Sequence, residues 1–332
     1  MTTALVSSAL CLEHLAHPQH PERPDRLRAV ARGIQGAALG SDLVEIEAQA
    51  APDDVIARVH AADQVALLEH LDARGGGSID ADTAMNEHSL AAARVAAGAG
   101  LQAVEALRAG RAGVALCAVR PPGHHATPSR SMGFCLLNNV AITAQALADA
   151  GERVAIVDID AHHGNGTHDA FYGRSDVLFV STHQWPLYPG TGAVTERGAG
   201  DGVGATVNLP VPPSTGGEEY RRLAGEVIGP ALDRFAPDWI LVSAGFDAHR
   251  RDPLTDLGLT SADYTELLVG LQASVSPGRL VIFLEGGYDL EALEHCVTDA
   301  LVGLNGGAQR CEALTTENRN RAAVDQLIDF HR

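Results

Sequence analysis

Two aspartates and a histidine follow one short apolar run in this chain: Asp158, Asp160 and His162. The run, residues 154–159, is typical of a buried strand, and the glycines that follow it indicate a turn. Side chains alternate along a strand, so we expect the three polar residues to share one face. Buried carboxylates are costly unless a cation or hydrogen-bond donors compensate them, and two carboxylates with an imidazole suit a divalent metal. The pattern predicts a metal site, although the same acids could cap a helix or pair with arginine.

Two adjacent histidines, His124 and His125, follow another apolar run at residues 114–119. Prolines and a glycine between the run and the histidines favour a stiff exit and a sharp turn. Such a pair can be plain loop surface. Beside an acidic metal site, an imidazole that titrates near neutrality can take a proton from water and return it to a leaving amine.

Asp247 and Tyr288 end two further apolar runs, residues 239–244 and 280–284. A third acid joins Asp160 and His162 in a set that leaves a coordination position open, as a catalytic zinc requires. Its alternative role is an ion pair with the arginines at 250 and 251. The Tyr288 phenol follows two glycines and could donate to a developing oxyanion, and its alternative role is packing in the core.

Short β-rich runs alternate with helical segments from about residue 110 onward, which predicts an α/β fold with three α/β/α layers and a mostly parallel central sheet. We expect strands at 114–119, 154–159, 177–182, 239–244 and 280–284, and helices at 24–34, 52–70, 89–108, 137–150 and 218–235. Residues 75–83 indicate a surface loop. Ligands of such sheets bind beyond the carboxyl ends of the strands, so these endings can form one site. Without repeats or linkers, one domain over residues 1–332 is the expectation.

The composition is that of a globular protein, with 332 residues, 45% hydrophobic residues and 35 Gly. We expect no apolar stretch long enough to span a bilayer, no membrane partner and no secretory signal. Five widely spaced cysteines favour reduced thiols and a cytoplasmic location.

The chain carries a net charge of −18, and every basic residue is arginine. An acidic surface disfavours nucleic acid as a partner and favours polyamines or lysine-rich tails, although solubility alone also explains it. The absence of lysine excludes a Schiff-base mechanism and a Walker-type phosphate loop.

Taken together, these segments resemble the histone deacetylase and acetylpolyamine amidohydrolase superfamily of arginase-like metal hydrolases. The motifs that carry the resemblance are 17–26 (HPQHPERPDR), 120–126 (RPPGHHA), 133–139 (GFCLLNN), 158–167 (DIDAHHGNGT), 188–192 (YPGTG), 244–249 (AGFDAH) and 285–288 (EGGY). The resemblance implies a zinc-dependent amidohydrolase that removes acetyl groups from N-acetylated primary amines, either acetyl-lysine in a peptide or a small acetylpolyamine. It also allows a homo-oligomer.

The resemblance further assigns roles to residues at the strand ends. Asp160, His162 and Asp247 match the zinc ligands. His125 matches the general base and acid, His124 its electrostatic partner, and Tyr288 the phenol that polarises the carbonyl. Asp158 matches the residue that orients His124 and also contacts a structural K⁺, whose remaining ligands match the Ser181 side chain and the backbone oxygens of Asp160, His162 and Thr182.

The acyl channel is implied in the same way. Gly133, Phe134, Tyr188, Leu254 and Gly286 match positions along it. Tyr188 stands where many relatives carry Phe, and Leu254 stands where a polyamine-selective branch carries an acid. Asn165 replaces an Asp of other branches, which places the chain with the class II-like bacterial branch and should leave His125 less basic.

Two rival functions remain open at this point. A dinuclear, arginase-like hydrolase would need more carboxylates around two metal ions than these strand ends supply. A catalytically silent module that binds acetylated or cationic partners would be expected to lack the phenol, a histidine or a ligand, and all of these are present.

Overall fold

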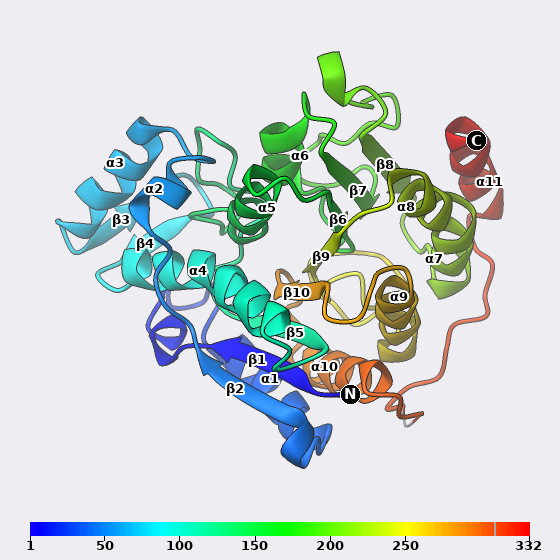
Figure 1. Ribbon diagram of the computed structural model, residues 1–332, viewed down its shortest axis with the longest axis horizontal. Helices are drawn as coiled ribbons and strands as arrows, with labels where there is room; N and C mark the ends of the chain where they lie inside the picture. Colours follow the sequence, from blue (N-terminus) through cyan, green and yellow to red (C-terminus); the bar gives the residue numbers. More distant parts are fainter. Residues whose placement is uncertain (309) are drawn as a thin grey trace.

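A central sheet of eight strands organises the protein, which a computed structural model describes over residues 1–308 and 310–332 (Figure 1). The strands are β1 Thr3–Ser7, β2 Leu43–Glu47, β5 Val114–Ala118, β6 Val154–Asp158, β7 Val177–Gln184, β8 Thr206–Val211, β9 Trp239–Ala244 and β10 Leu280–Leu284. Their order is β2-β1-β5-β10-β9-β6-β7-β8, and all the pairings are parallel. The predicted parallel sheet and its five predicted strands are confirmed.

Helices cover both faces of the sheet. They are α1 Asp25–Gly36, α2 Asp53–Ile56, α3 Ala62–Asp72, α4 Ser89–Arg108, α5 Asn139–Asp149, α6 Asn165–Phe171, α7 Gly217–Leu223, α8 Gly229–Phe235, α9 Ser261–Ala273, α10 Leu290–Leu304 and α11 Arg321–His331, with short helices η1 Ala9–Leu12, η2 Gly40–Asp42, η3 Gly200–Gly202 and η4 Ala224–Ile228. One layer contains α4, α5 and α6, and the other contains α1, α10, α9 and α7 (Figure 1). The expected three-layer architecture is therefore present.

The central strands β5, β6, β9 and β10 are buried along their whole length. Strands covered by helices on both faces become continuous apolar runs, which explains why the sequence revealed them. The edge strands β2 and β8 are harder to recognise. β2 is half exposed, and β8 contains Asn208 and Pro210, a proline that only an edge strand tolerates. Neither of them, nor the short β1, was among the predicted strands.

Two of the predicted helices are interrupted in the structure. The segment 52–70 forms α2 and α3 separately, because His60 between them turns inward to contact the Gln64 side chain and the Thr127 carbonyl. The segment 218–235 contains the π-helical turn η4 between α7 and α8. Pro230 in the first turn of α8 has no N–H to donate, which accounts for the local change in hydrogen bonding.

The loop expected at 75–83 is partly ordered as a two-stranded antiparallel sheet. Strand β3, Gly76–Ser78, pairs with β4, Ala84–Asn86. This hairpin lies next to α3. Its turn carries Asp82 and Thr83, and the Thr83 hydroxyl accepts the Phe134 N–H at 3.0 Å.

The expectation that no apolar stretch could span a bilayer was wrong for α4. This helix has 20 residues, and an 18-residue segment of it has a mean hydropathy of 1.2. By length and composition it could cross a membrane. However, 72% of that segment is buried inside the protein, where α4 packs on β1 and β5. A buried core helix can be equally long and apolar, so α4 is weak evidence for a membrane span.

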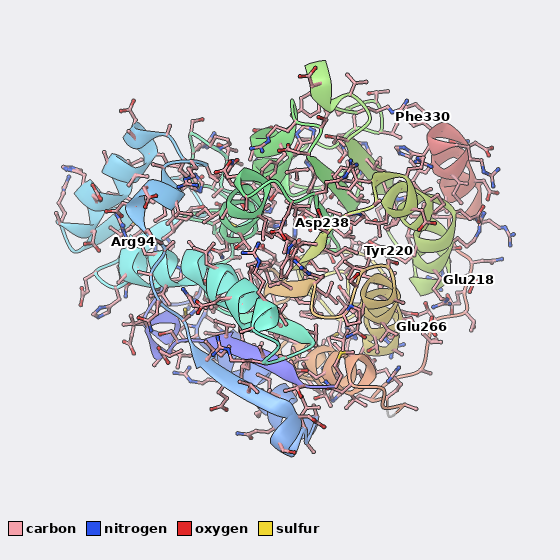
Figure 2. All side chains as sticks on the ribbon, viewed as in Figure 1. Arg94, Glu218, Tyr220, Asp238, Glu266 and Phe330 are labelled. Carbon is pink, nitrogen blue, oxygen red and sulfur yellow. The ribbon has the colours of Figure 1, made fainter. Side chains whose placement is uncertain are left out.

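Side chains at the periphery tie these helices together. Arg94 of α4 forms ion pairs with Asp53 of α2 and Glu69 of α3, and Figure 2 shows Arg94 at the edge of the α3 and α4 region. The five cysteines are all free thiols, as predicted, and four of them are buried.

Candidate active site

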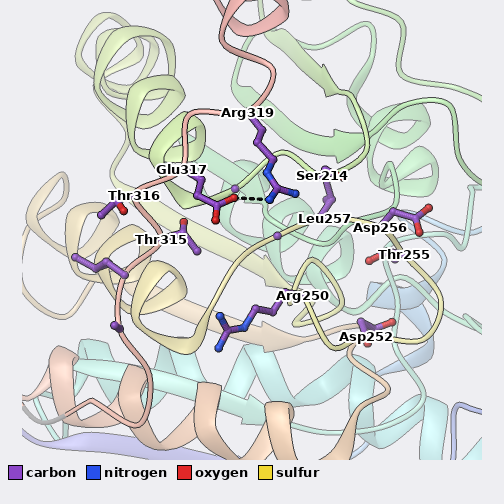
Figure 3. A pocket seen from close by; sticks show the side chains of 14 residues that line it. Ser214, Arg250, Asp252, Thr255, Asp256, Leu257, Thr315, Thr316, Glu317 and Arg319 are labelled. Atoms are coloured by element: carbon purple, nitrogen blue, oxygen red, sulfur yellow. Dashed lines mark ion pairs between the residues drawn. The ribbon is translucent and has the colours of Figure 1, made fainter.

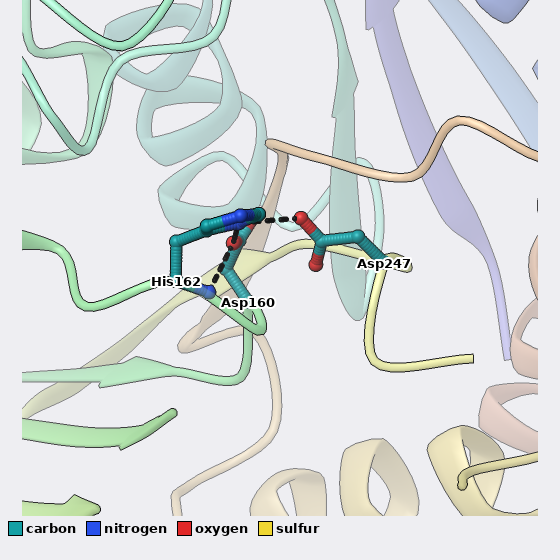
Figure 4. Close-up of side chains that lie close together, drawn as sticks. All are labelled: Asp160, His162 and Asp247. Atoms are coloured by element: carbon teal, nitrogen blue, oxygen red, sulfur yellow. Dashed lines mark hydrogen bonds and ion pairs between the residues drawn. The ribbon is translucent and has the colours of Figure 1, made fainter. Parts of the chain in front are cut away.

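Asp160, His162 and Asp247 converge beyond the carboxyl ends of β6 and β9, which are neighbours in the sheet (Figure 4). The His162 Nδ1 atom lies 3.1 Å from Asp160 Oδ1 and 3.0 Å from Asp247 Oδ2. Both aspartates are buried, and each forms its ion pairs with imidazoles. Hydrogen bonds to both carboxylates raise the pKa of His162 to about 10 despite its burial. Two carboxylates and one imidazole at this spacing can hold a single metal ion.

Glycines surround these three side chains at very close range. A Cβ atom on Gly245 would lie within 2 Å of Asp160 Oδ2, and one on Gly286 would lie 2.2 Å from Asp247 Oδ2. The Gly286 N–H also donates to Asp160 Oδ2 at 2.8 Å, and the Ala161 N–H donates to Asp247 Oδ1 at 2.8 Å. The backbone therefore fixes the orientation of both carboxylates.

We expect Gly286→Ala to weaken the binding of a divalent metal ion to this cluster by roughly 10- to 100-fold, the usual effect of disturbing groups that orient metal ligands. The added methyl group would displace the Asp247 and Asp160 carboxylates. Competition with a chromogenic zinc chelator measures the affinity. Gly270→Ala in α9 is the matched control, because its Cβ would meet no atom within 4 Å. Equal metal affinity in both variants would show that glycine at position 286 is not needed to orient the two carboxylates.

Asp158 does not belong to the group that could hold the metal, contrary to the simple alternation of residues 158, 160 and 162. Strand β6 ends at Asp158, so regular alternation ends there too. Its Oδ1 accepts the N–H of Asp160 at 3.1 Å, and its Oδ2 lies 3.0 Å from His124 Nδ1. Asp158 thus contacts His124 and stands outside the group that could hold the metal.

The two adjacent histidines differ in charge. Burial alone would lower the pKa of His124, but the charges of Asp160 and Asp158 raise it well above its usual value. Burial, together with the charges of His124 and His162, lowers the pKa of His125 well below its usual value. The surroundings therefore favour the protonated form of His124 and the neutral form of His125.

Asn165 determines which nitrogen of His125 carries the proton. The Asn165 Oδ1 atom lies 2.7 Å from His125 Nδ1, while its Nδ2 faces the sulfur of Met132 at 3.5 Å. An amide oxygen can only accept, so Nδ1 carries the hydrogen and Nε2 keeps its lone pair. The neutral His125 is thus prepared to accept a proton at Nε2.

Tyr288 comes from the loop after β10 and lines the same cavity as the two histidines. Burial raises the pKa of its phenol well above the ordinary value, and Arg26 opposes this shift only in part. The phenol stays protonated at neutral pH and remains a hydrogen-bond donor. Its backbone N–H donates to Asp252 Oδ2 at 2.7 Å, which fixes this part of the loop.

A cavity of about 240 Å³ leads to these groups. All five predicted channel residues line it: Gly133, Phe134, Tyr188, Leu254 and Gly286. The Tyr188 ring meets the His125 ring edge to face, with centroids 5.2 Å apart. Asp82 and Leu187 also line the cavity.

Gly133 and Phe134 have an unusual backbone conformation, and Phe134 forms part of the wall of the cavity. Both have positive φ, at 56° and 69°, a region that is unfavourable for Phe134. The Phe134 N–H donates to the Thr83 hydroxyl at 3.0 Å, and Met132 and Cys135 bond across the turn. A Cβ on Gly133 would meet the His125 ring at 2.5 Å, so glycine is required there.

The residues expected around K⁺ are brought together in part. Asp158 pairs with Ser181 in the register of β6 and β7, and Ser181 Oγ lies 3.0 Å from His183 Nδ1. Thr182 follows in β7 and is buried. Asp158 and Ser181 are therefore neighbours across these two strands.

Sequence reasoning from strand ends missed a buried network that supports the site. Arg26 donates to the carbonyl oxygens of Glu285 and Gly287, and its guanidinium lies 4.9 Å from the centroid of the Tyr288 ring. Glu22 bridges Arg26 and Arg120. The motif 17–26 contains Glu22 and Arg26, and the motif 120–126 contains Arg120, but neither motif indicated these contacts.

Glu285 was also quoted only as part of a motif. Its Oε2 atom accepts the N–H groups of Gly123 and His124 at 2.7 and 3.1 Å. Burial raises the pKa of its carboxyl to about 7. Glu285 thus connects the loop that carries the histidine pair to the loop that carries Tyr288.

Comparison with known proteins identifies the family of this chain. The family model of the histone deacetylase domain matches residues 20–304. A probable deacetylase of Archaeoglobus fulgidus is 42% identical over 297 residues, covering 88% of this chain and 82% of the relative. A histone deacetylase-like amidohydrolase of Pseudomonas aeruginosa is 37% identical, covering 77% and 69%. The crystal structure of the HDA15 HD domain superposes with a TM-score of 0.91 at 34% identity, covering 99% of this chain and 94% of that one.

Proposed function

Because this chain belongs to the histone deacetylase family, we propose that it is a zinc-dependent amidohydrolase that removes acetyl groups from N-acetylated primary amines. Its substrate would be acetyl-lysine in a peptide or an acetylpolyamine. The observation that carries the proposal is the convergence of His124, His125 and Tyr288 on the cavity that also reaches Asp160 and His162. We further propose that residues 1–332 form a single catalytic domain of a cytoplasmic enzyme.

The donor sets fit the two ions that we propose. Two carboxylate oxygens and one imidazole nitrogen leave a coordination position open, as in catalytic zinc sites. Asp158 and the Ser181 hydroxyl, with the carbonyls of Asp160, His162 and Thr182, would form an all-oxygen set, which suits a hard monovalent cation such as K⁺. A bound Zn²⁺ would supply Lewis acidity, which polarises an amide carbonyl and makes a water molecule more acidic.

The channel residues would orient the substrate before the reaction. Phe134 and Tyr188 would enclose the methylene chain of an acyl-lysine or polyamine, and the narrow cavity would exclude bulk water from the acetyl group. Fixing the amide next to the histidine pair lowers the entropic part of the barrier.

The proton would then move through His125. Its unprotonated Nε2 would take the proton of the attacking water and later give it to the departing amine. The cationic His124, held by Asp158, would stabilise negative charge as it develops. The Tyr288 hydroxyl would donate a hydrogen bond to the carbonyl oxygen as it becomes an oxyanion.

The decisive experiment measures turnover of a fluorogenic acetyl-lysine amide, acetylputrescine and acetylspermidine with one preparation. We expect activity that is lost on chelation and restored by one equivalent of zinc per chain. A stoichiometry of two metal ions would favour the dinuclear rival, and zinc-loaded protein that turns over none of the substrates would favour the silent binding module.

We expect Asn165→Asp to shift the acidic limb of the kcat/KM profile to higher pH by about 1 unit or more. An Asp carboxylate beside Nδ1 favours the charged imidazolium and raises the pKa of His125, which is now low. A higher pH would then be needed to deprotonate His125. The pH profiles of both proteins measure the shift. An acidic limb at the same pH in both would remove His125 as the titrating base.

A further inference from the structure

A second and larger cavity lies beside the active site, between residues 250–258 and the C-terminal segment 313–319 (Figure 3). Its volume is about 760 Å³, within the range of about 300–1,000 Å³ that small-molecule sites occupy. The two cavities share one loop, since Leu254 lines the catalytic cavity whereas Asp252 and Thr255 line the second one.

The C-terminal wall of this cavity lies outside the part of the chain that the family model matches, which ends at residue 304. Hydrogen bonds nevertheless hold this wall firmly. The Thr260 hydroxyl donates to the Ala313 carbonyl at 2.9 Å, and the Thr315 hydroxyl donates to Asp263 at 3.0 Å and accepts from the Gly217 N–H at 2.6 Å. These bonds attach residues 313 and 315 of the wall to the starts of α7 and α9, while the charged side chains of the wall stay largely exposed.

Charged groups of both signs line the cavity. Arg250 stands on one wall and Arg319 on the other, and Figure 3 shows Arg319 directed toward Glu317. Each guanidinium forms one ion pair at 2.6 Å through a single terminal nitrogen, Arg250 with Glu312 and Arg319 with Glu317. A guanidinium has five N–H donors, so each retains donors for a ligand carboxylate.

Acceptors for a ligand cation are present in the same cavity. Glu317 and Asp256 contribute carboxylates, and Ser214 and Thr316 contribute hydroxyl groups. A ligand with a single charge would satisfy only one of the two sets. A small zwitterion, with an ammonium and a carboxylate a few bonds apart, matches both.

The shared loop connects this cavity to the catalytic groups. Asp252 accepts the backbone N–H of Tyr288 through Oδ2 and that of Leu254 through Oδ1, at 2.7 and 2.9 Å. The Thr255 hydroxyl donates to the carbonyl oxygen of Asp247. The backbone positions of the phenol and of one proposed metal ligand thus depend on two residues in the wall of the second cavity.

We propose that this cavity is an effector site for a free α-amino acid, and that its occupancy raises turnover by bracing the loop behind Tyr288 and Asp247. Its influence on turnover rests on the proposed deacetylase function, whereas binding does not. A bound zwitterion would hold residues 252–255 in the arrangement that places the phenol at the substrate carbonyl. The ligand would act on kcat more than on KM, because only Leu254 of the five channel residues lies in this loop and the walls at Phe134 and Tyr188 lie in other segments.

Titration calorimetry tests the binding. L-Serine and L-arginine are the probes, and propionate and propylamine are comparators that carry one charge each. We expect one amino-acid site per chain and at least about tenfold weaker binding of the comparators, the effect of losing a hydrogen bond to a charged group. Arg319→Ala should weaken amino-acid binding similarly, whereas Arg234→Ala, an exposed arginine of α8, should leave it unchanged. No heat with either amino acid, or equal binding to the Arg319→Ala variant, overturns the site.

Steady-state kinetics test the coupling. Saturating L-serine should raise kcat for an acetyl-lysine substrate on the order of fivefold, the lower end of common allosteric effects, with little change in KM. Arg319→Ala should keep basal turnover and lose the response. Binding without a change in kcat would overturn the coupling. Protein that lacks deacetylase activity but binds the amino acid would refute the proposed function and leave the site standing.

Discussion

Tyr288→Phe should lower kcat for deacetylation by about 10²-fold or more while zinc binding and folding are retained. The magnitude is that of removing one donor from a developing oxyanion. The substitution deletes only the hydroxyl, and the ring can keep its contacts with Arg26 and Phe134. Turnover under saturating substrate measures the loss, since a group that acts only in the transition state changes kcat rather than KM.

Tyr220→Phe is the matched control for this variant. Tyr220 is a buried tyrosine, and its hydroxyl has no hydrogen-bond partner among the described residues. Because the residue does not line the catalytic cavity, we expect parental kcat. If Tyr288→Phe turned over as fast as Tyr220→Phe, the phenol would have no part in the chemistry.

Asp247→Ala should abolish zinc stoichiometry and activity together. The remaining pair, Asp160 and His162, would offer too few ligands to hold a catalytic zinc, and loss of the metal would lower the rate by roughly 10³-fold or more, since a Lewis acid contributes several kcal/mol. Elemental analysis of the purified protein measures the zinc, and the fluorogenic assay measures the rate.

An exposed acid supplies the control for this change. Asp233→Ala in α8 also removes one carboxylate, but an exposed one that does not line the catalytic cavity, so it should leave both quantities at parental values. Circular dichroism of both variants separates loss of the metal from loss of the fold. A full equivalent of zinc in folded Asp247→Ala protein would remove Asp247 from the ligand set.

The sequence by itself determined the central strands and the chemistry at their ends. β5, β6, β9 and β10 are buried on both faces, so their apolar runs are continuous and easily recognised. The carboxyl ends of parallel strands lie along one edge, which predicted that His124, Asp160, Asp247 and Tyr288 would meet although up to 164 residues separate them. Residue types then indicated a metal site with an acid and a base.

Only the tertiary structure decided which partner each of these groups has. Alternation placed Asp158 with Asp160 and His162, but the strand ends at Asp158, and its carboxylate holds His124 instead. Arg26 supports the Tyr288 loop from α1 through contacts about 260 residues apart in sequence, which no local pattern encodes. The second cavity arises where the C-terminal segment docks beside residues 250–258. Periodicity reports which face of an element is buried, whereas such contacts depend on how distant elements are registered against one another.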